Sequence, residues 1–162
     1  MNLGDSLLND SAIALPRDPS ASFDSLDIHA AALLEPDATA ELARLGSRGF
    51  VTGAVRTWSD GQRIVEVALQ RFAASRDARL ALEETRHALL AAAGEERVDR
   101  GGELDDRQTV TVIRVREIVG GFVADVAIGC AGRVTVSVLL GGSNVDERRA
   151  ASLLRMQLAR LS

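Results

Sequence analysis

The chain has 162 residues, of which 46% are hydrophobic and 26% charged, and its formal net charge is -4. This length and composition suit one globular domain with a buried core and exclude intrinsic disorder of the whole chain. The acidic balance and an aromatic content of 3% disfavour nucleic-acid binding, which needs a basic surface and rings for base stacking.

The residue types that are missing narrow the chemistry further. All 19 Lys and Arg residues are Arg, so the chain has no Schiff-base amine and no phosphate-loop lysine. Cys130 is the single cysteine, which excludes an intramolecular disulfide. The apolar runs are far shorter than the ~20 residues that a membrane-spanning helix needs, and we expect no transmembrane segment.

The first 25 residues are rich in Asn, Asp, Ser and Pro, which predicts a flexible N-terminal tail or linker that could serve as a tether. They show no signal-peptide pattern, because Asp5 and Asp10 interrupt the apolar positions of residues 1–15. Residues 26–162 are expected to form a single α+β domain.

Hydrophobic periodicity and capping residues predict the elements of that domain. In chain order they are a short helix at 36–45, strands at 50–58 and 63–72, a helix from 75 to about 93, an edge strand near Val98, strands at 108–119, 122–130 and 134–140, and a last helix from Asn144.

The clearest local signal is a hairpin. Asp60-Gly61 lies between two strands and is a favoured two-residue turn. A turn at these residues pairs Trp58 with Arg63 and Arg56 with Val65. The valines of the second strand then share a face with Arg56 and Trp58.

A strand-strand-helix pattern occurs twice, over about 49–93 and 121–161. Each copy opens on Gly-Phe-Val, at Gly49 and at Gly121, and continues through an Arg-led strand into an amphipathic helix. We therefore predict an antiparallel β-sheet packed against helices and built from a duplicated ββα unit.

No motif assembles a catalytic, metal or cofactor site. His29 and His87 have no second ligand at metal-binding spacing and are expected on solvated surfaces. Cys130 is in phase with core residues, residues 141–144 are typical of a helix cap, and the acidic segment 95–106 interleaves arginines and is typical of a solvated loop. No cofactor is predicted.

Four residues are the best candidates for a binding site, because arginines are unusual on the apolar face of a strand. They are Arg56, Trp58, Arg63 and Arg71. In one interpretation they line a cleft with the tryptophan as a stacking wall, suited to a protein partner or a small acidic or sugar-like ligand. In the other, the arginine stems cover the sheet edge and pair with carboxylates, namely Glu66, Glu117 and Asp125.

The segments Arg56-Thr57-Trp58, Val65-Glu66-Val67 and Arg71-Phe72 resemble a group of poorly characterised actinobacterial secreted or lipoprotein-anchored domains. The architecture also looks like that of Mog1/PsbP-like and mycobacterial kinase-sensor domains. The resemblance covers about residues 26–162 and implies a non-enzymatic envelope domain of unknown ligand. The chain departs from the group because no leader or lipobox cysteine is visible.

Three functions therefore stay open. The preferred one is a non-catalytic binding module, extracytoplasmic if an upstream leader was removed and cytoplasmic otherwise. The second is a small hydrolase or transferase whose acid and base come from Glu66, Asp125 or His87 brought together in space. The third is a structural subunit that assembles through the sheet edge at 108–119 and could form a homodimer.

Overall fold

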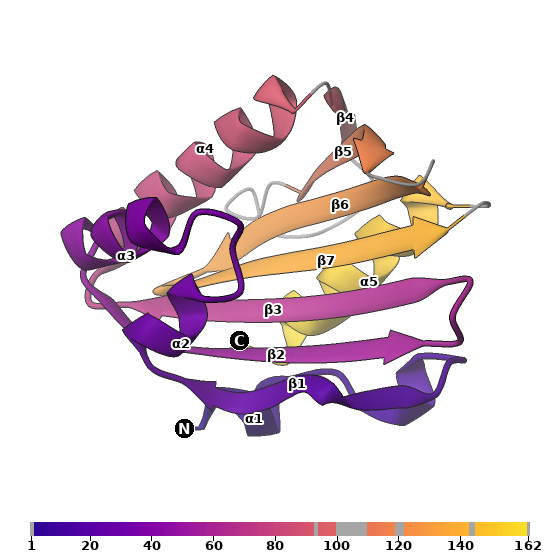
Figure 1. Ribbon diagram of the computed structural model, residues 1–162, viewed down its shortest axis with the longest axis horizontal. Helices are drawn as coiled ribbons and strands as arrows, with labels where there is room; N and C mark the ends of the chain where they lie inside the picture. The colour runs from indigo at the N-terminus through magenta and orange to yellow at the C-terminus, as the bar shows by residue number, and fades with distance from the viewer. Residues whose placement is uncertain (1, 93, 100–109, 119–121, 143–144, 162) are drawn as a thin grey trace.

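The computed structural model describes residues 2–92, 94–99, 110–118, 122–142 and 145–161. Within these residues, seven strands form one antiparallel sheet in the order β1-β2-β3-β7-β6-β5-β4, with helices on both faces (Figure 1). This confirms the predicted α+β class with an antiparallel sheet.

The elements follow the order of the chain. They are α1 (Leu3–Ser6), the 3-10 turn η1 (Asp10–Ala12), β1 (Arg17–Leu26), α2 (Ile28–Ala32), α3 (Ala38–Ser47), β2 (Phe50–Ser59), β3 (Ile64–Phe72), α4 (Ser75–Ala91), β4 (Gly94–Asp99), β5 (Val110–Ile118), β6 (Phe122–Ala131), β7 (Val134–Gly142) and α5 (Glu147–Ala159).

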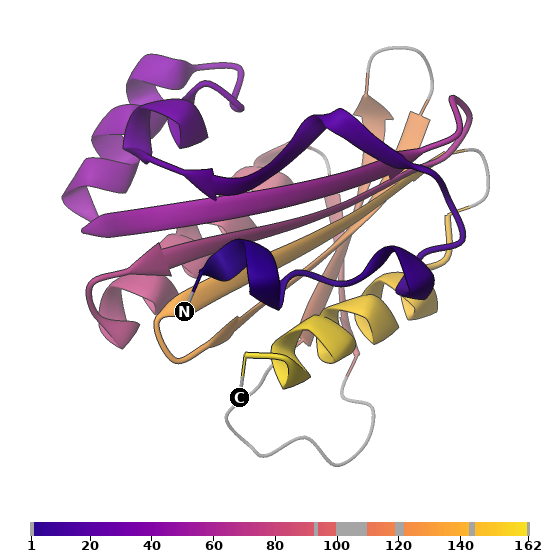
Figure 2. The ribbon, with the colours of Figure 1, turned by 90° about the horizontal axis from the view of Figure 1, so that it is seen from below.

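The sheet separates two packed layers (Figure 2). On one face, α5 and the N-terminal segment pack on strand residues such as Val67 and Val138. On the other face, α2, α3 and α4 cover the sheet in two smaller clusters, one around Phe72 and one around Ile113. Side chains alternate between the faces of a strand, so β3 contributes to both layers.

The predicted hairpin forms, but its register differs by two residues. Trp58 pairs with Val65 and Arg56 with Val67, because the connection is a four-residue loop at 60–63. The Asp60 carboxylate accepts hydrogen bonds from the amides of Gln62 (3.0 Å) and Arg63 (2.8 Å), which stabilises the longer loop. An even shift keeps every side chain on its predicted face.

The predicted flexible tail is corrected by the structure. Leu3, Leu7 and Leu8 are 3%, 0% and 2% exposed, and β1 is an edge strand paired with β2. The polar residues of this segment act locally instead. For example, the side chain of Asn2 caps α1 by accepting a hydrogen bond from the amide of Gly4.

The two proposed repeat units are present as β2-β3-α4 and β6-β7-α5, but their helices cover opposite faces of the sheet. The duplication therefore stays a prediction. The last helix is capped by Asp146, whose carboxylate accepts from the amide of Arg148; Asn144, where this helix was predicted to begin, lies outside the described residues. Most of the acidic segment 95–106 also lies outside them.

Candidate functional site

Two of the four predicted site residues hold the N-terminal segment in place. Trp58 is 0% exposed, and its Nε1 donates a hydrogen bond to Asp10 at 2.8 Å. Arg56 donates to the backbone oxygens of Leu8 (2.9 Å) and Gly4 (3.2 Å). The indole is therefore covered by the chain itself, which corrects the prediction of a stacking wall.

The other two residues lie apart from this contact. Arg63 precedes β3 and pairs with Asp60 at 2.6 Å, and this pairing, with hydrogen bonds from two amides, lowers the pKa of Asp60 to about 2. Arg71 lies at the opposite end of β3 and is half-buried. Because two of the four residues contact the N-terminal segment and the other two lie at opposite ends of β3, the four side chains do not form one cleft.

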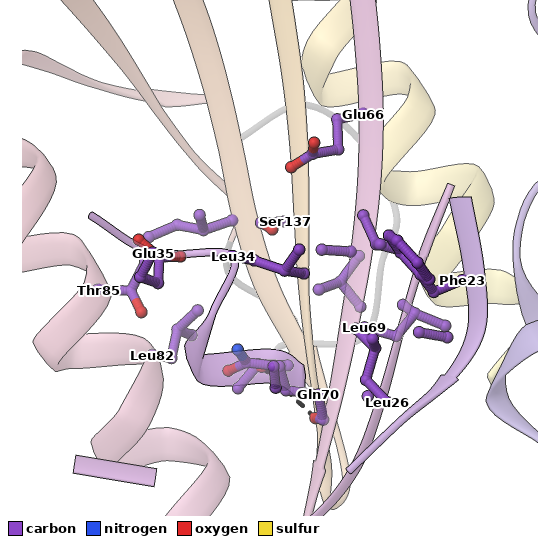
Figure 3. A pocket seen from close by; sticks show the side chains of 18 of the residues that line it. Phe23, Leu26, Leu34, Glu35, Glu66, Leu69, Gln70, Leu82, Thr85 and Ser137 are labelled. Carbon is purple, nitrogen blue, oxygen red and sulfur yellow. Dashed lines mark hydrogen bonds between the residues drawn. The ribbon is translucent and has the colours of Figure 1, made fainter. Parts of the chain in front are cut away.

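A pocket lies on the opposite face of the sheet, between the α2–α3 segment, α4, β1 and the central strands (Figure 3). Its volume is about 250 Å³. Strands β3 and β7 form a polar floor, while the walls are mixed. Its lining includes Phe23, Leu26, Leu34, Glu35, Arg44, Glu66, Ala68, Gln70, Leu82, Thr85, Thr135 and Ser137.

The pairing of β3 with β7 builds the polar floor. Ala68 pairs with Ser137 and Gln70 with Thr135, so polar side chains from segments far apart in sequence meet on one face. The Gln70 amide group and the Ser137 hydroxyl make no hydrogen bond with another described residue. Groups of this kind in a pocket are available to water or a ligand.

Glu66 is the carboxyl group on this floor. It is half-buried, and within the described residues its one hydrogen bond is a long contact of 3.4 Å from the Thr57 hydroxyl. Burial raises the pKa of Glu66; Thr57 opposes this shift, and the charge of Glu35 adds to it. The expected pairing of Glu66 with an arginine is therefore not observed.

Charged residues at the rim form their own network. The Arg44 guanidinium donates to both oxygens of Glu41 at 2.7 and 2.6 Å and lies 3.5 Å from Glu84. Glu84 is also paired with Arg48. Glu35 stands beside this network, and its pKa is raised by partial burial and then by the charge of Glu41.

The residues proposed for an acid-base pair do not meet. Glu66 faces the pocket, whereas Asp125 lies on the opposite face, buried and bonded to Arg114 at 2.7 and 2.9 Å. His87 is exposed on α4. Burial raises the pKa of the Cys130 thiol, which disfavours the nucleophilic thiolate. No cluster of three potential metal ligands occurs among the described residues.

The proposed edge for assembly is also corrected. The strand predicted at 108–119 appears as β5, which pairs with β4 on one side and β6 on the other. Its backbone groups are therefore occupied within the sheet. The edges of the described sheet are β1 and β4.

Sequence reasoning missed the pocket. Its polar residues, Glu66 and Gln70 in one strand and Thr135 and Ser137 in the other, are typical of a solvated sheet face. The available signal was the amphipathic helix that follows the first hairpin, since a helix over a polar strand face leaves a lined space instead of a solvated one.

Comparison with known proteins supports the fold. No family model matches the chain, and no curated protein matches it. The structure is similar to the crystal structure of the extracellular domain of PknH from Mycobacterium tuberculosis, with a TM-score of 0.66 and 14% sequence identity over 99% of this chain and 94% of that one.

PknH is a mycobacterial kinase, so this likeness confirms, at the level of fold, the resemblance to kinase-sensor domains. At this identity it carries no residue roles across. Among the described residues, no helix combines the length and apolar character needed to cross a bilayer.

Proposed function

We propose that the domain is a non-catalytic binding or sensing module of the cell envelope, and that it binds a small ligand in the pocket over β3 and β7. The observation that carries this proposal is the half-buried floor of polar groups with few protein partners, above all Glu66 with its single long hydrogen bond. Half-buried polar groups that the protein leaves largely unbonded are available to a ligand that supplies the partner.

The fold is consistent with this role. In the described residues, α2, α3 and α4 cover one face of the sheet and leave the pocket between them, and the overall fold is similar to that of the PknH extracellular domain. Glu66, Asp125 and His87 lie apart, which favours binding over acid-base catalysis. A small acidic ligand is disfavoured because Glu35 and Glu66 would repel it.

The pocket is tested with a fragment library and amide NMR spectra of the intact chain. We expect fragments to shift the amides of Ala68, Gln70 and Ser137. Ser137→Trp fills the pocket and should abolish these shifts. Ser152→Trp is the matched control, since Ser152 is exposed on α5 at the opposite face, and it should bind as the wild type does.

The proposal fails if no fragment binds, if the shifts map to another surface, or if Ser137→Trp binds fragments unchanged. Dispersed spectra of both variants establish that each is folded. The envelope location is tested separately by expressing the natural gene with a C-terminal epitope and treating intact cells with a protease. Loss of the epitope is expected, and protection of it would contradict that location.

A further inference from the structure

The described lining of the pocket contains two carboxyl groups, and its one arginine, Arg44, is hydrogen-bonded to Glu41 instead. Glu66 comes from the floor and Glu35 from the rim, and the charge of Glu35 acts unfavourably on Glu66. Neither forms an ion pair with an arginine among the described residues. Like charges in a partly closed space raise the free energy of the empty pocket.

Arg44 is the positive side chain in the described lining, and its hydrogen bonds go to the rim network and not to Glu35 or Glu66. Its Nε and Nη2 atoms donate to Glu41, and its Nη1 atom faces Glu84 at 3.5 Å. Redirecting it toward Glu35 or Glu66 would leave the half-buried Glu41 without its partner. The charge of Arg44 offsets part of the upward shift in the pKa of Glu35, whereas no arginine among the described residues acts in this way on the pKa of Glu66.

Large apolar side chains form part of the walls. Figure 3 shows Phe23 on one side of the pocket and Thr85 and Glu35 on the other, with Leu34 between them. Phe23 and Leu34 are 39% and 50% exposed, so both are accessible to a ligand in the pocket. The Phe23 ring lies across the pocket from Glu35, where it offers an apolar surface to the body of a ligand.

We infer that the ligand is a small organic cation, an amine with a short apolar body, whose ammonium lies between Glu66 and Glu35 and whose body contacts Phe23 and Leu34. This inference rests on the proposed function and specifies its ligand class. The cavity of about 250 Å³ lies just below the ≈ 300–1,000 Å³ of pockets for drug-sized molecules, so we expect the ligand to be smaller than a drug-sized molecule. A neutral polyol is the competing ligand, because Gln70, Thr135 and Ser137 could bind hydroxyl groups.

Three probes of similar shape distinguish these possibilities: 2-phenylethylamine, 2-phenylethanol and 3-phenylpropionate. Their dissociation constants are measured near pH 7 by amide NMR titration of the intact chain. We expect the amine to bind about tenfold more tightly than the alcohol, as one charge-assisted hydrogen bond provides. The carboxylate should not bind.

Glu66→Gln should weaken binding of the amine by about tenfold and leave binding of the alcohol unchanged. Glu83→Gln is the matched control, because Glu83 lies exposed on α4 and is not part of the pocket lining. It should change neither constant, and its spectrum reports on folding.

Each outcome has a distinct meaning. If the alcohol shifts the pocket amides as tightly as the amine does, or if Glu66→Gln leaves the amine affinity unchanged, the cation inference is overturned while the pocket remains a binding site. If none of the three probes shifts the pocket amides, both the inference and the proposed site fail.

Discussion

Replacing Arg56 with methionine separates a structural role from a binding role. The Arg56 side chain is 12% exposed and bonds to Leu8 and Gly4 of the N-terminal segment, with an ion pair to Asp24 at 2.9 Å. Methionine keeps the apolar stem of the side chain and removes only the guanidinium. The change therefore tests whether this charge stabilises the fold.

The magnitude follows from the contacts. Leaving two backbone carbonyls without their donor costs about 1–3 kcal/mol each where they are buried. Because Asp24 is 56% exposed, its ion pair contributes no more than about 1 kcal/mol. We expect Arg56→Met to lower the free energy of unfolding by about 3 kcal/mol, which corresponds to a fall in Tm of roughly 8 °C.

Urea denaturation and amide hydrogen exchange measure this effect. Exchange should accelerate most at Leu7 and Leu8. The control is Arg63→Met, because Arg63 is 57% exposed and, among the described residues, pairs with Asp60 of the same turn. An exposed pair of this kind contributes no more than about 1 kcal/mol, so this variant should lose much less stability than Arg56→Met. An Arg56→Met variant as stable as the wild type, or an equal loss in Arg63→Met, would refute the structural role.

Three further predictions concern Glu66, the glycines and Gln157. Burial raises the pKa of Glu66 above its usual 4.5, so the folded state binds this proton more tightly than the unfolded state and stability falls as the pH rises above about 4.5. Glu66→Gln should therefore be more stable than the wild type at pH 7, and this advantage in Tm should disappear below pH 4.5. A difference in Tm that does not change with pH would contradict the raised pKa. A Cβ on Gly4 would lie 2.5 Å from the Cβ of Asp24, so Gly4→Ala should lower the free energy of unfolding by on the order of 2 kcal/mol. Gly46→Ala in α3 is the comparison, because its Cβ would meet only a side-chain methyl at 3.9 Å, and it should raise stability by ~0.5–1 kcal/mol. Equal changes in Tm for the two variants would argue against the close contact between Gly4 and Asp24. Gln157→Leu removes the hydrogen-bond partner of the Leu8 amide (2.9 Å) and one donor to the Ser6 carbonyl (2.7 Å). We expect it to lower the free energy of unfolding, measured in urea, by about 2–3 kcal/mol. An unchanged free energy of unfolding would show that α5 does not hold the N-terminal segment in this way.

Much of the fold could be predicted from local pattern. The alternation in Val65-Glu66-Val67 specifies a strand and its two faces whatever the loop length. A two-residue error in the predicted register therefore left every side chain on its correct face. The helix predicted at 36–45 is present as α3, shifted by two residues to Ala38–Ser47, because Asp37 is its N-cap and accepts a hydrogen bond from the amide of Ala40 at 3.0 Å. These features depend on neighbours within a few residues.

The errors came from contacts between distant parts of the chain. Composition made residues 1–25 look like a tail, yet Leu8 is buried because Gln157 binds it from α5. Arg56 and Trp58 were predicted as site residues because the sequence does not show that their partners lie in the N-terminal segment. The pocket depends on β3 lying beside β7, and no local pattern states which strands become neighbours.

The bonds from Gln157 and Arg160 to the segment at Ser6 and Leu8 join the two ends of the described chain on the face opposite the pocket (Figure 2). The chain is thus closed into a near-circle by non-covalent bonds. A circular permutant that links the two ends through a short flexible connector and opens at the exposed Asp60-Gly61 turn should keep both layers of the core. A pulling force applied between the ends would break this closure first, before it loads the strands that form the pocket.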